Sequence, residues 1–309
     1  MPERPPALTP LPGIWPALLT PLNADLSIDH TRFAALARAL VAAGCGGVTP
    51  FGTTGEGPSF SLDERRRAVD AMVEGGVPGP RILVSTSCAA LPETVALTRH
   101  ALSIGAWGSL MLPPFYLKGV SDQGIIDCYR YVIDTVADSR LRLMLYHIPQ
   151  VTSVGLSHTV IAELLRLYPD TIVGIKDSAC DQAHSLALAD AFMPGITVHV
   201  GNELDLPALG RRGSTGAVSG LANFMPRVVH GLVTQPDSAR TAHDLERVRS
   251  LLAHLGGYAL MPALKGIMAH LTGDTTWLRV RPPLVALDAA SYRALQDWMH
   301  NFPIDPHTD

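Results

Sequence analysis

Short apolar runs alternate with amphipathic stretches along most of the chain. The runs lack an alternating polar face, which is typical of parallel strands that are buried on both sides of a sheet. The stretches between them place apolar residues at helical spacing, as in residues 33–41 and 160–168. The expected strands cover residues 13–20, 46–50, 81–87, 109–113, 141–146, 171–176, 196–201 and 215–219.

Eight strand-helix units in succession predict a (β/α)8 (TIM) barrel, the catalytic domain, over residues 13–222. A doubly wound open sheet is the alternative, but residues 13–22 contain none of the G-x-G-x-x-G turn that its first strand would favour. Beyond residue 223 the strand pattern stops and helical spacing continues, so we expect residues 223–309 to form a helical C-terminal region packed on the barrel. Residues 1–12 are proline-rich and predict an extended or disordered arm.

Two helix starts are marked by their residue types. Ser61 and Glu64 form the two ends of a capping box, in which each side chain bonds to the other's backbone amide. Pro92 suits a first helical position, where a missing N–H group costs nothing.

Composition and charge favour a soluble globular protein with a small-molecule ligand. Of the 309 residues, 47% are hydrophobic and 17% charged, and the net charge of −4 comes without a basic stripe, so nucleic acids and anionic membranes are unsuitable partners. The beginning of the chain does not resemble a secretory signal, and no apolar run is long enough to span a membrane. The four cysteines contain no C-x-x-C pair, which argues against a zinc ribbon and a secreted disulfide scaffold and favours the cytoplasm.

Lysine is rare in this chain, and Lys176 ends an apolar run. Only three lysines accompany 21 arginines. An arginine stays charged, whereas a desolvated lysine amine loses its proton and can attack a carbonyl carbon. Lys176 is therefore a candidate imine-forming nucleophile, with two alternatives: its ammonium extends to solvent at the strand end, or it pairs with Asp177.

Polar residues gather at the expected C-terminal strand ends, where a barrel carries its chemistry. The segment 52–56, Gly-Thr-Thr-Gly-Glu, offers amides and hydroxyls to a small anion, or is an ordinary turn; it lacks the lysine of a nucleotide-binding loop, so a carboxylate fits better than a triphosphate. Tyr146 and Tyr116 are candidate proton carriers or packed aromatics. The strand ends carry Thr53, Thr54, Glu56, Ser85, Ser87, Tyr116, Tyr146, His147, Lys176, Asp177, Gly201, Asn202, Glu203 and Ser219.

Four motifs in order resemble a known superfamily. They are G-T-T-G-E at 52–56, Y-H-I-P at 146–149, G-I-K-D-S at 174–178 and G-S-T-G-A-V-S at 213–219. The chain from about residue 13 onward resembles the pyruvate-dependent class I aldolases, the superfamily of N-acetylneuraminate lyase and dihydrodipicolinate synthase.

The resemblance implies a mechanism and an assembly. Lys176 would form a Schiff base with pyruvate, and Tyr146 would relay protons through Thr53 and Tyr116. Thr53 and Thr54 would hold the pyruvate carboxylate, and no metal or organic cofactor would be needed. In relatives the tyrosine matching Tyr116 comes from a neighbouring subunit, which implies a homodimer that is commonly arranged as a tetramer, a dimer of dimers.

The substrate half is where the sequence departs from familiar members. Dihydrodipicolinate synthases typically carry an arginine five positions after the strand-five tyrosine, to bind the carboxylate of aspartate semialdehyde; this position is Val151, and Arg142 lies inside the strand. The acidic pair of sialic acid lyases is half present, as Glu203 and Leu204. The pattern is more similar to that of 2-keto-3-deoxy sugar acid aldolases and dehydratases. The predicted substrate-binding residues are Thr54, Val151, Ser178, Gly201, Asn202, Glu203, Val218 and Ser219.

Several functions remain open on the sequence. Dihydrodipicolinate synthase and N-acetylneuraminate lyase are alternatives within the superfamily. A metal-dependent barrel aldolase would use His147 and His199, although no H-E-x-x-H motif or tight histidine cluster supports it. A non-catalytic regulator or binding protein that keeps the fold is the third hypothesis.

Overall fold

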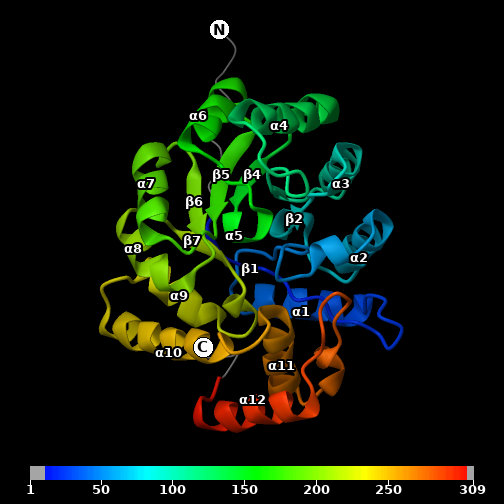
Figure 1. Cartoon of the computed structure of the whole chain (residues 1–309), viewed down its shortest axis with the longest axis vertical. Helices are drawn as coiled ribbons and strands as arrows, with labels where there is room; N and C mark the ends of the chain where they lie inside the picture. The colour runs from blue at the N-terminus through cyan, green and yellow to red at the C-terminus, as the bar shows by residue number, and fades with distance from the viewer. Residues whose placement is uncertain (1–10, 305–309) are drawn as a thin grey trace.

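A computed structural model describes residues 11–304 and contains a parallel sheet curled into a barrel (Figure 1). The seven regular strands follow the order β1-β7-β6-β5-β4-β3-β2 and pair in parallel throughout. They are β1 (Gly13–Pro16), β2 (Leu83–Ser85), β3 (Gly108–Met111), β4 (Leu143–His147), β5 (Ile172–Asp177), β6 (Thr197–Val200) and β7 (Gly216–Ser219).

The predicted strand at residues 46–50 closes the barrel without forming a regular strand. It lies between β1 and β2 and makes one parallel bridge to each side, Thr49 to Ala17 and Val48 to Ile82. These bridges join the two edges of the sheet, so eight segments surround the barrel. The (β/α)8 architecture is confirmed, and the sheet has seven regular strands and one irregular segment.

The composition of this closing segment explains its irregularity. Gly46 and Gly47 weaken regular pairing, and Pro50 has no N–H group to donate. Space requires the second glycine, because a Cβ atom on Gly47 would lie 2.2 Å from the Trp15 ring. Residues 46–50 therefore contain glycines that let the backbone lie close to Trp15, and these glycines disfavour a regular strand.

Helices surround the barrel and cover its outer face (Figure 1). The predicted capping box is present, with Ser61 and Glu64 bonding to each other's amides at the start of α2, and Pro92 lies in the first turn of α3. The helices are α1 (His30–Ala42), α2 (Leu62–Glu74), α3 (Leu91–Ser103), α4 (Asp122–Val136), α5 (Pro149–Thr152), α6 (His158–Leu167), α7 (Gln182–Phe192), α8 (Leu206–Arg211) and α9 (Pro226–Thr234).

Two apolar layers hold these elements in place. The larger one lies between the outer face of the sheet and the helices and consists of two clusters. A smaller one fills the barrel itself, as barrel interiors require, and includes Trp15, Leu83, Leu110, Met144 and Val218. A packed interior leaves the strand ends as the place where polar groups can meet a ligand.

Three further helices group at one end of the molecule (Figure 1). They are α10 (Ala239–Leu255), α11 (Leu260–Thr272) and α12 (Ala289–Asn301). The helices expected beyond residue 223 are present, and α11 has no single apolar stripe, because every residue from Pro262 to Ala269 is buried. Residues 1–10 of the predicted arm lie outside the described range, and Leu11 at its end is buried. Within residues 11–304 no helix is long and apolar enough to cross a membrane.

Candidate active site

Neighbouring strands bring Lys176 and Tyr146 together. The two residues are directly paired in the register of β4 and β5, and paired residues in a sheet point to the same face. The Lys176 Nζ atom lies 4.2 Å from the centre of the Tyr146 ring, and both side chains are buried. The sheet therefore holds an amine and a phenol side by side at its C-terminal edge.

The electrostatics of this pair favour proton exchange by Tyr146. Burial acts to raise the pKa of the phenol. The neighbouring Lys176 charge and hydrogen bonds with Thr53 and Ser178 outweigh burial, so the pKa lies below its ordinary value of 10.0. The hydroxyls of Tyr146 and Thr53 are 3.4 Å apart. A phenol with a lowered pKa can give and take a proton more readily at neutral pH.

The loop at residues 52–57 is tightly folded. The Gly57 amide donates to the Gly52 carbonyl and the Glu56 amide donates to the Thr53 carbonyl, each over 3.1 Å. Glu56 has a φ of +56°, in the left-handed region, which is costly for a residue with a side chain. The loop therefore presents Thr53 in one defined position.

Gly201 makes room for the lysine side chain. A Cβ atom at this position would lie 2.3 Å from Ser178 Oγ and 3.3 Å from Lys176 Cε. The Gly201 amide donates to the Asp177 carbonyl over 2.7 Å, which fixes the loop after β6 against β5. Gly201 and Ser178 thus form one side of the space around Lys176.

Glu203, the acidic candidate at this edge, is buried and hydrogen-bonded within the protein. Ser219 donates from its hydroxyl to Glu203 Oε1 over 2.5 Å, and Glu203 is buried. Burial raises the pKa of Glu203, although hydrogen bonds from the Ser219 hydroxyl and the Leu221 amide act to lower it. The same kind of link occurs nearby, where the Asn202 amide donates to Asp205 over 2.8 Å.

The remaining predicted residues lie in different surroundings. Val218 is buried inside the barrel, and Thr54 lies near Gly220, 3.4 Å from where a Cβ atom on that glycine would be. Tyr116 is 77% exposed and Val151 is 54% exposed. Within residues 11–304 of one chain, Tyr116 is therefore not part of the buried group around Tyr146.

A second polar cluster lies behind the lysine, on the outer face of the sheet. His147 and Asp177 each follow a site residue and so point the other way. Asp177 Oδ2 accepts from Ser185 over 2.7 Å and lies 3.0 Å from His184 Nδ1. The rings of His147 and His184 stack with centres 4.6 Å apart.

This arrangement separates the two histidines of the metal hypothesis. His199 is paired with Lys176 across β5 and β6, so it points to the opposite face from His147. His147, Asp177 and His184 offer ligand atoms within 4.8 Å of one another, a set of types that suits zinc. However, His147 Nδ1 already accepts from the Leu156 amide over 2.9 Å, and the cluster faces away from Lys176.

Two residues that the sequence did not predict for the site also shape it. Gln150 donates from its side-chain amide to the Ser178 carbonyl, and buried Arg65 donates to the carbonyls of Ser85 and Ser87 at the end of β2. The sequence contains an indication of the role of Arg65, because this residue lies on the apolar face of α2 together with three buried apolar residues. A cation at such a position indicates a buried hydrogen-bonding role.

Known proteins resemble this chain over most of its length. A curated relative from Chloroflexus aurantiacus, an uncharacterized DapA-like lyase, is 34% identical over 92% of this chain and 94% of its own length. The crystal structure of dihydrodipicolinate synthase from Agrobacterium tumefaciens is 31% identical, with a TM-score of 0.87 over 94% of this chain and 99% of that chain. YagE from E. coli K12, solved in complex with pyruvate, is 27% identical, with a TM-score of 0.83 over 94% and 98%. The model of the dihydrodipicolinate synthetase family matches residues 10–301, and the chain belongs to that family.

Proposed function

We propose that this protein is a class I lyase that forms a Schiff base between Lys176 and pyruvate or another 2-keto acid. The single observation that carries the proposal is the buried Lys176 amine, 4.2 Å from the ring of a phenol whose pKa is lowered. Family membership supports it, since members of the family are pyruvate-dependent lyases. The structure of YagE in complex with pyruvate supports the same substrate class.

The chemistry begins at the lysine nitrogen. A proton passes from the Lys176 ammonium to the Tyr146 phenolate, and the neutral amine then attacks the keto carbon. Tyr146 returns that proton to the departing oxygen, which takes a second proton from the nitrogen and leaves as water. The protonated imine withdraws electrons from the adjacent methyl carbon, whose proton passes to the Tyr146 phenolate, and the methyl carbon becomes an enamine carbon. In synthesis that carbon bonds to the aldehyde carbon while Tyr146 gives its proton to the aldehyde oxygen. In cleavage the same bond breaks while Tyr146 takes that proton back. Water then hydrolyses the imine and regenerates the amine.

Thr53 and Thr54 are suited to the substrate carboxylate. The hydroxyl of Thr53 is within 3.4 Å of the Tyr146 hydroxyl, so a carboxylate bound here would place the neighbouring keto carbon close to both reacting groups. The tight loop at residues 52–57 holds these groups before the substrate arrives. Pre-organisation of this kind lowers the cost of binding.

For the other half of the substrate we propose a 2-keto-3-deoxy sugar acid. Val151 offers no charge to a second carboxylate, and Arg142, which precedes β4, lies over the Trp107 ring at 5.7 Å, at the opposite end of the barrel from Lys176. Hydroxyl-bearing substrates would instead bond to Ser178, Gly201, Asn202 and neighbouring groups.

The exposure of Tyr116 supports a homo-oligomer. A phenol that is 77% exposed in one chain is available to a neighbouring subunit, and we propose a dimer of dimers in which Tyr116 completes the proton relay of the partner. The cytoplasm is the proposed location. Light scattering on the purified protein would test the assembly, and a monomeric mass with full activity would refute it.

One experiment tests the central proposal. The protein is incubated with pyruvate and borohydride, digested, and analysed by mass spectrometry. A reduced pyruvate adduct is expected on the peptide that contains Lys176, and its absence would exclude the imine. Turnover is then compared on 2-keto-3-deoxy sugar acids, N-acetylneuraminate, and pyruvate with aspartate semialdehyde, which separates the proposed substrate from the two alternatives in the family.

A further inference from the structure

A second lysine, Lys265, forms a fully buried ion pair with Glu56. The two charged groups are in contact, and both side chains are 0% exposed. Lys265 belongs to α11 of the C-terminal helical region, and Glu56 belongs to the loop at residues 52–57. The ion pair therefore connects the C-terminal region to the loop that carries Thr53 and Thr54.

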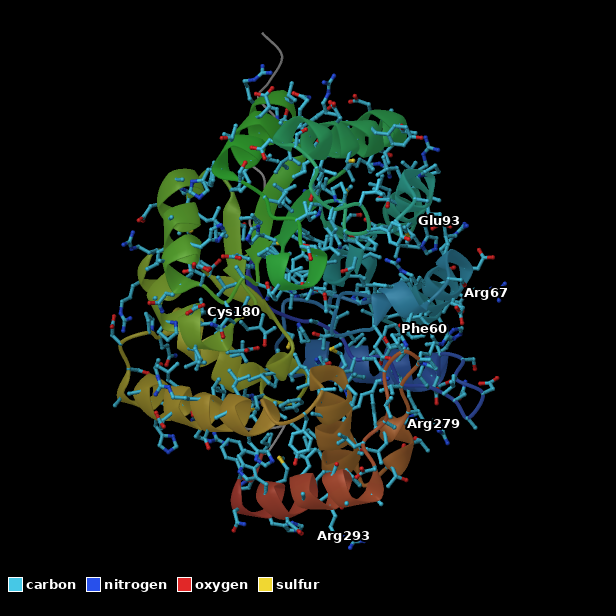
Figure 2. The ribbon with its side chains drawn as sticks, viewed as in Figure 1. Phe60, Arg67, Glu93, Cys180, Arg279 and Arg293 are labelled. Carbon is cyan, nitrogen blue, oxygen red and sulfur yellow. The ribbon has the colours of Figure 1, made fainter. Side chains whose placement is uncertain are left out.

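Further hydrogen bonds satisfy this pair on the C-terminal side. Lys265 Nζ donates to the Arg279 carbonyl over 2.8 Å, and the Arg281 amide donates to Glu56 Oε2 over 3.3 Å. Figure 2 labels Phe60 and Arg279 on this flank of the molecule, and the Arg281 guanidinium lies 4.4 Å from the centre of the Phe60 ring. The C-terminal segment thus contacts the loop from several directions.

Stability alone does not account for a buried ion pair. Removing two charges from water has a large desolvation cost, and well-packed apolar residues often serve stability equally well. Burial lowers the pKa of Lys265, and the Glu56 carboxylate opposes that effect. What an ion pair adds is a defined direction and distance between the two elements that it joins.

The loop backbone links Glu56 to Thr53 at the candidate active site. The Glu56 amide donates to the Thr53 carbonyl, and the Thr53 hydroxyl lies 3.4 Å from the Tyr146 hydroxyl. The loop is tightly packed next to Glu56, because a Cβ atom on Gly57 would lie 1.9 Å from the Phe51 carbonyl oxygen. The loop backbone therefore connects Glu56 directly to the residue whose hydroxyl faces Tyr146.

We propose that Glu56 and Lys265 are positioning residues, by which helix α11 sets Thr53 relative to Tyr146 and so determines the affinity for the 2-keto acid and the rate of proton transfer. The inference rests on the proposed function, in which Thr53 binds the substrate carboxylate. It gives the C-terminal helical region a part in substrate binding, although none of its residues is among the predicted substrate-binding residues.

The test uses the full chain and a variant that removes both charges at nearly constant volume, Glu56→Gln combined with Lys265→Met. Borohydride trapping at Lys176 is measured over a range of pyruvate concentrations, together with deuterium exchange at the pyruvate methyl group. We expect the half-saturating pyruvate concentration to rise at least about tenfold and exchange to slow, since small misplacements of binding groups reduce rates strongly. The single variant Glu56→Gln provides the same measurement if the double variant does not fold.

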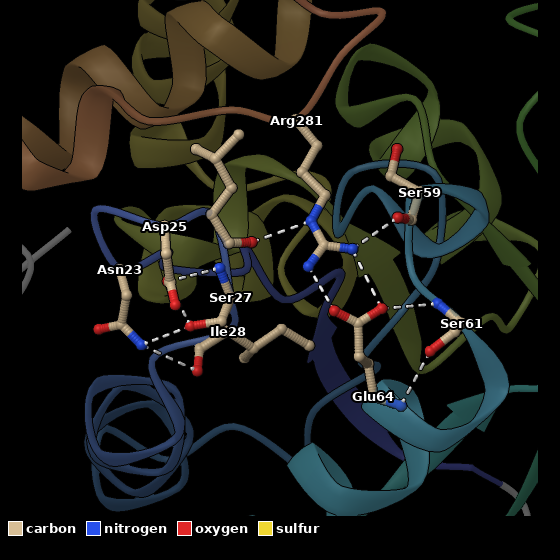
Figure 3. Close-up of polar contacts among 9 residues, drawn as sticks. Asn23, Asp25, Ser27, Ile28, Ser59, Ser61, Glu64 and Arg281 are labelled. Atoms are coloured by element: carbon tan, nitrogen blue, oxygen red, sulfur yellow. Dashed lines mark hydrogen bonds and ion pairs between the residues drawn. The ribbon is translucent and has the colours of Figure 1, made fainter.

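A nearby ion pair supplies the matched control. Arg281 contacts the carboxylate of Glu64 on α2, as Figure 3 shows, and this pair of side chains also joins the C-terminal segment to the barrel. The bond from Arg281 to Glu56 uses the backbone amide, which Glu64→Gln does not remove. Glu64→Gln should lower stability in urea and leave the half-saturating pyruvate concentration unchanged. A folded Glu56 variant with wild-type half-saturation and exchange would overturn the inference alone. A wild-type protein without any adduct at Lys176 would overturn the proposed function and this inference with it.

Discussion

Replacing Gly201 by alanine tests whether the space beside Lys176 controls its chemistry. The new Cβ atom would lie 2.3 Å from Ser178 Oγ and 3.3 Å from Lys176 Cε. The serine hydroxyl can rotate away, but the lysine must then move by a few tenths of an ångström. We expect about 1 kcal/mol of lost stability from the crowding. We also expect a loss of ten- to a hundredfold in the rate of adduct formation, equivalent to about 1.4–2.7 kcal/mol of transition-state stabilisation.

The assay is the rate of borohydride-trapped adduct formation at saturating pyruvate, beside urea unfolding of the same sample. Gly231→Ala is the matched control, because Gly231 lies within α9 and a Cβ atom there meets nothing within 4 Å. This control should gain about 0.5–1 kcal/mol of stability and keep the wild-type rate. If Gly201→Ala folds and traps pyruvate as fast as the wild type, the spatial argument is refuted.

Other predictions concern single groups. Lys176→Arg should abolish turnover, because guanidinium supplies no nucleophilic amine, and activity within tenfold of wild type would contradict the assignment. Tyr146→Phe should fold normally and turn over roughly 10²-fold more slowly, which a steady-state measurement of kcat would check. Burial lowers the pKa of His199 from 6.5 to about 3, so the unfolded chain takes up a proton between these values that the folded chain does not. Between pH 7.5 and pH 5 this residue should remove about 2 kcal/mol of unfolding free energy, and urea unfolding of His199→Leu should lack that part of the loss; an equal loss in the variant would contradict the argument. Turnover should be unchanged in chelator, and loss of activity that is restored by added zinc would reopen the metal hypothesis.

The barrel followed from the sequence because buried parallel strands leave a pattern that is independent of their neighbours. Apolar runs located the strands, and the rule that chemistry lies at C-terminal strand ends placed Lys176, Tyr146 and Thr53 at one edge. The structure places these three side chains together. Their roles stay predictions until the adduct is measured.

What the sequence could not predict depends on contacts between distant segments. The hydrogen bond between Ser219 and Glu203 depends on the direction in which the Glu203 side chain points, and the local sequence pattern does not predict that direction. Lys265 and Glu56 pair although they are far apart in the chain. The rarity of lysine marked Lys265 as unusual but did not indicate its partner. The irregular segment at residues 46–50 follows from the proximity of Gly47 to Trp15, which is a property of the closed barrel.

The burial of two of the three lysines has a practical consequence for labelling. Lys176 and Lys265 are buried, whereas Lys118 is exposed on the loop that carries Tyr116. Lys118 Nζ also donates to the Thr152 carbonyl over 2.8 Å, which holds it beside α5 and Val151. A reagent that reacts with amines should therefore modify, among the lysines, mainly Lys118. A fluorescent group attached there would report on the surroundings of Tyr116 and Val151 while leaving Lys176 unmodified.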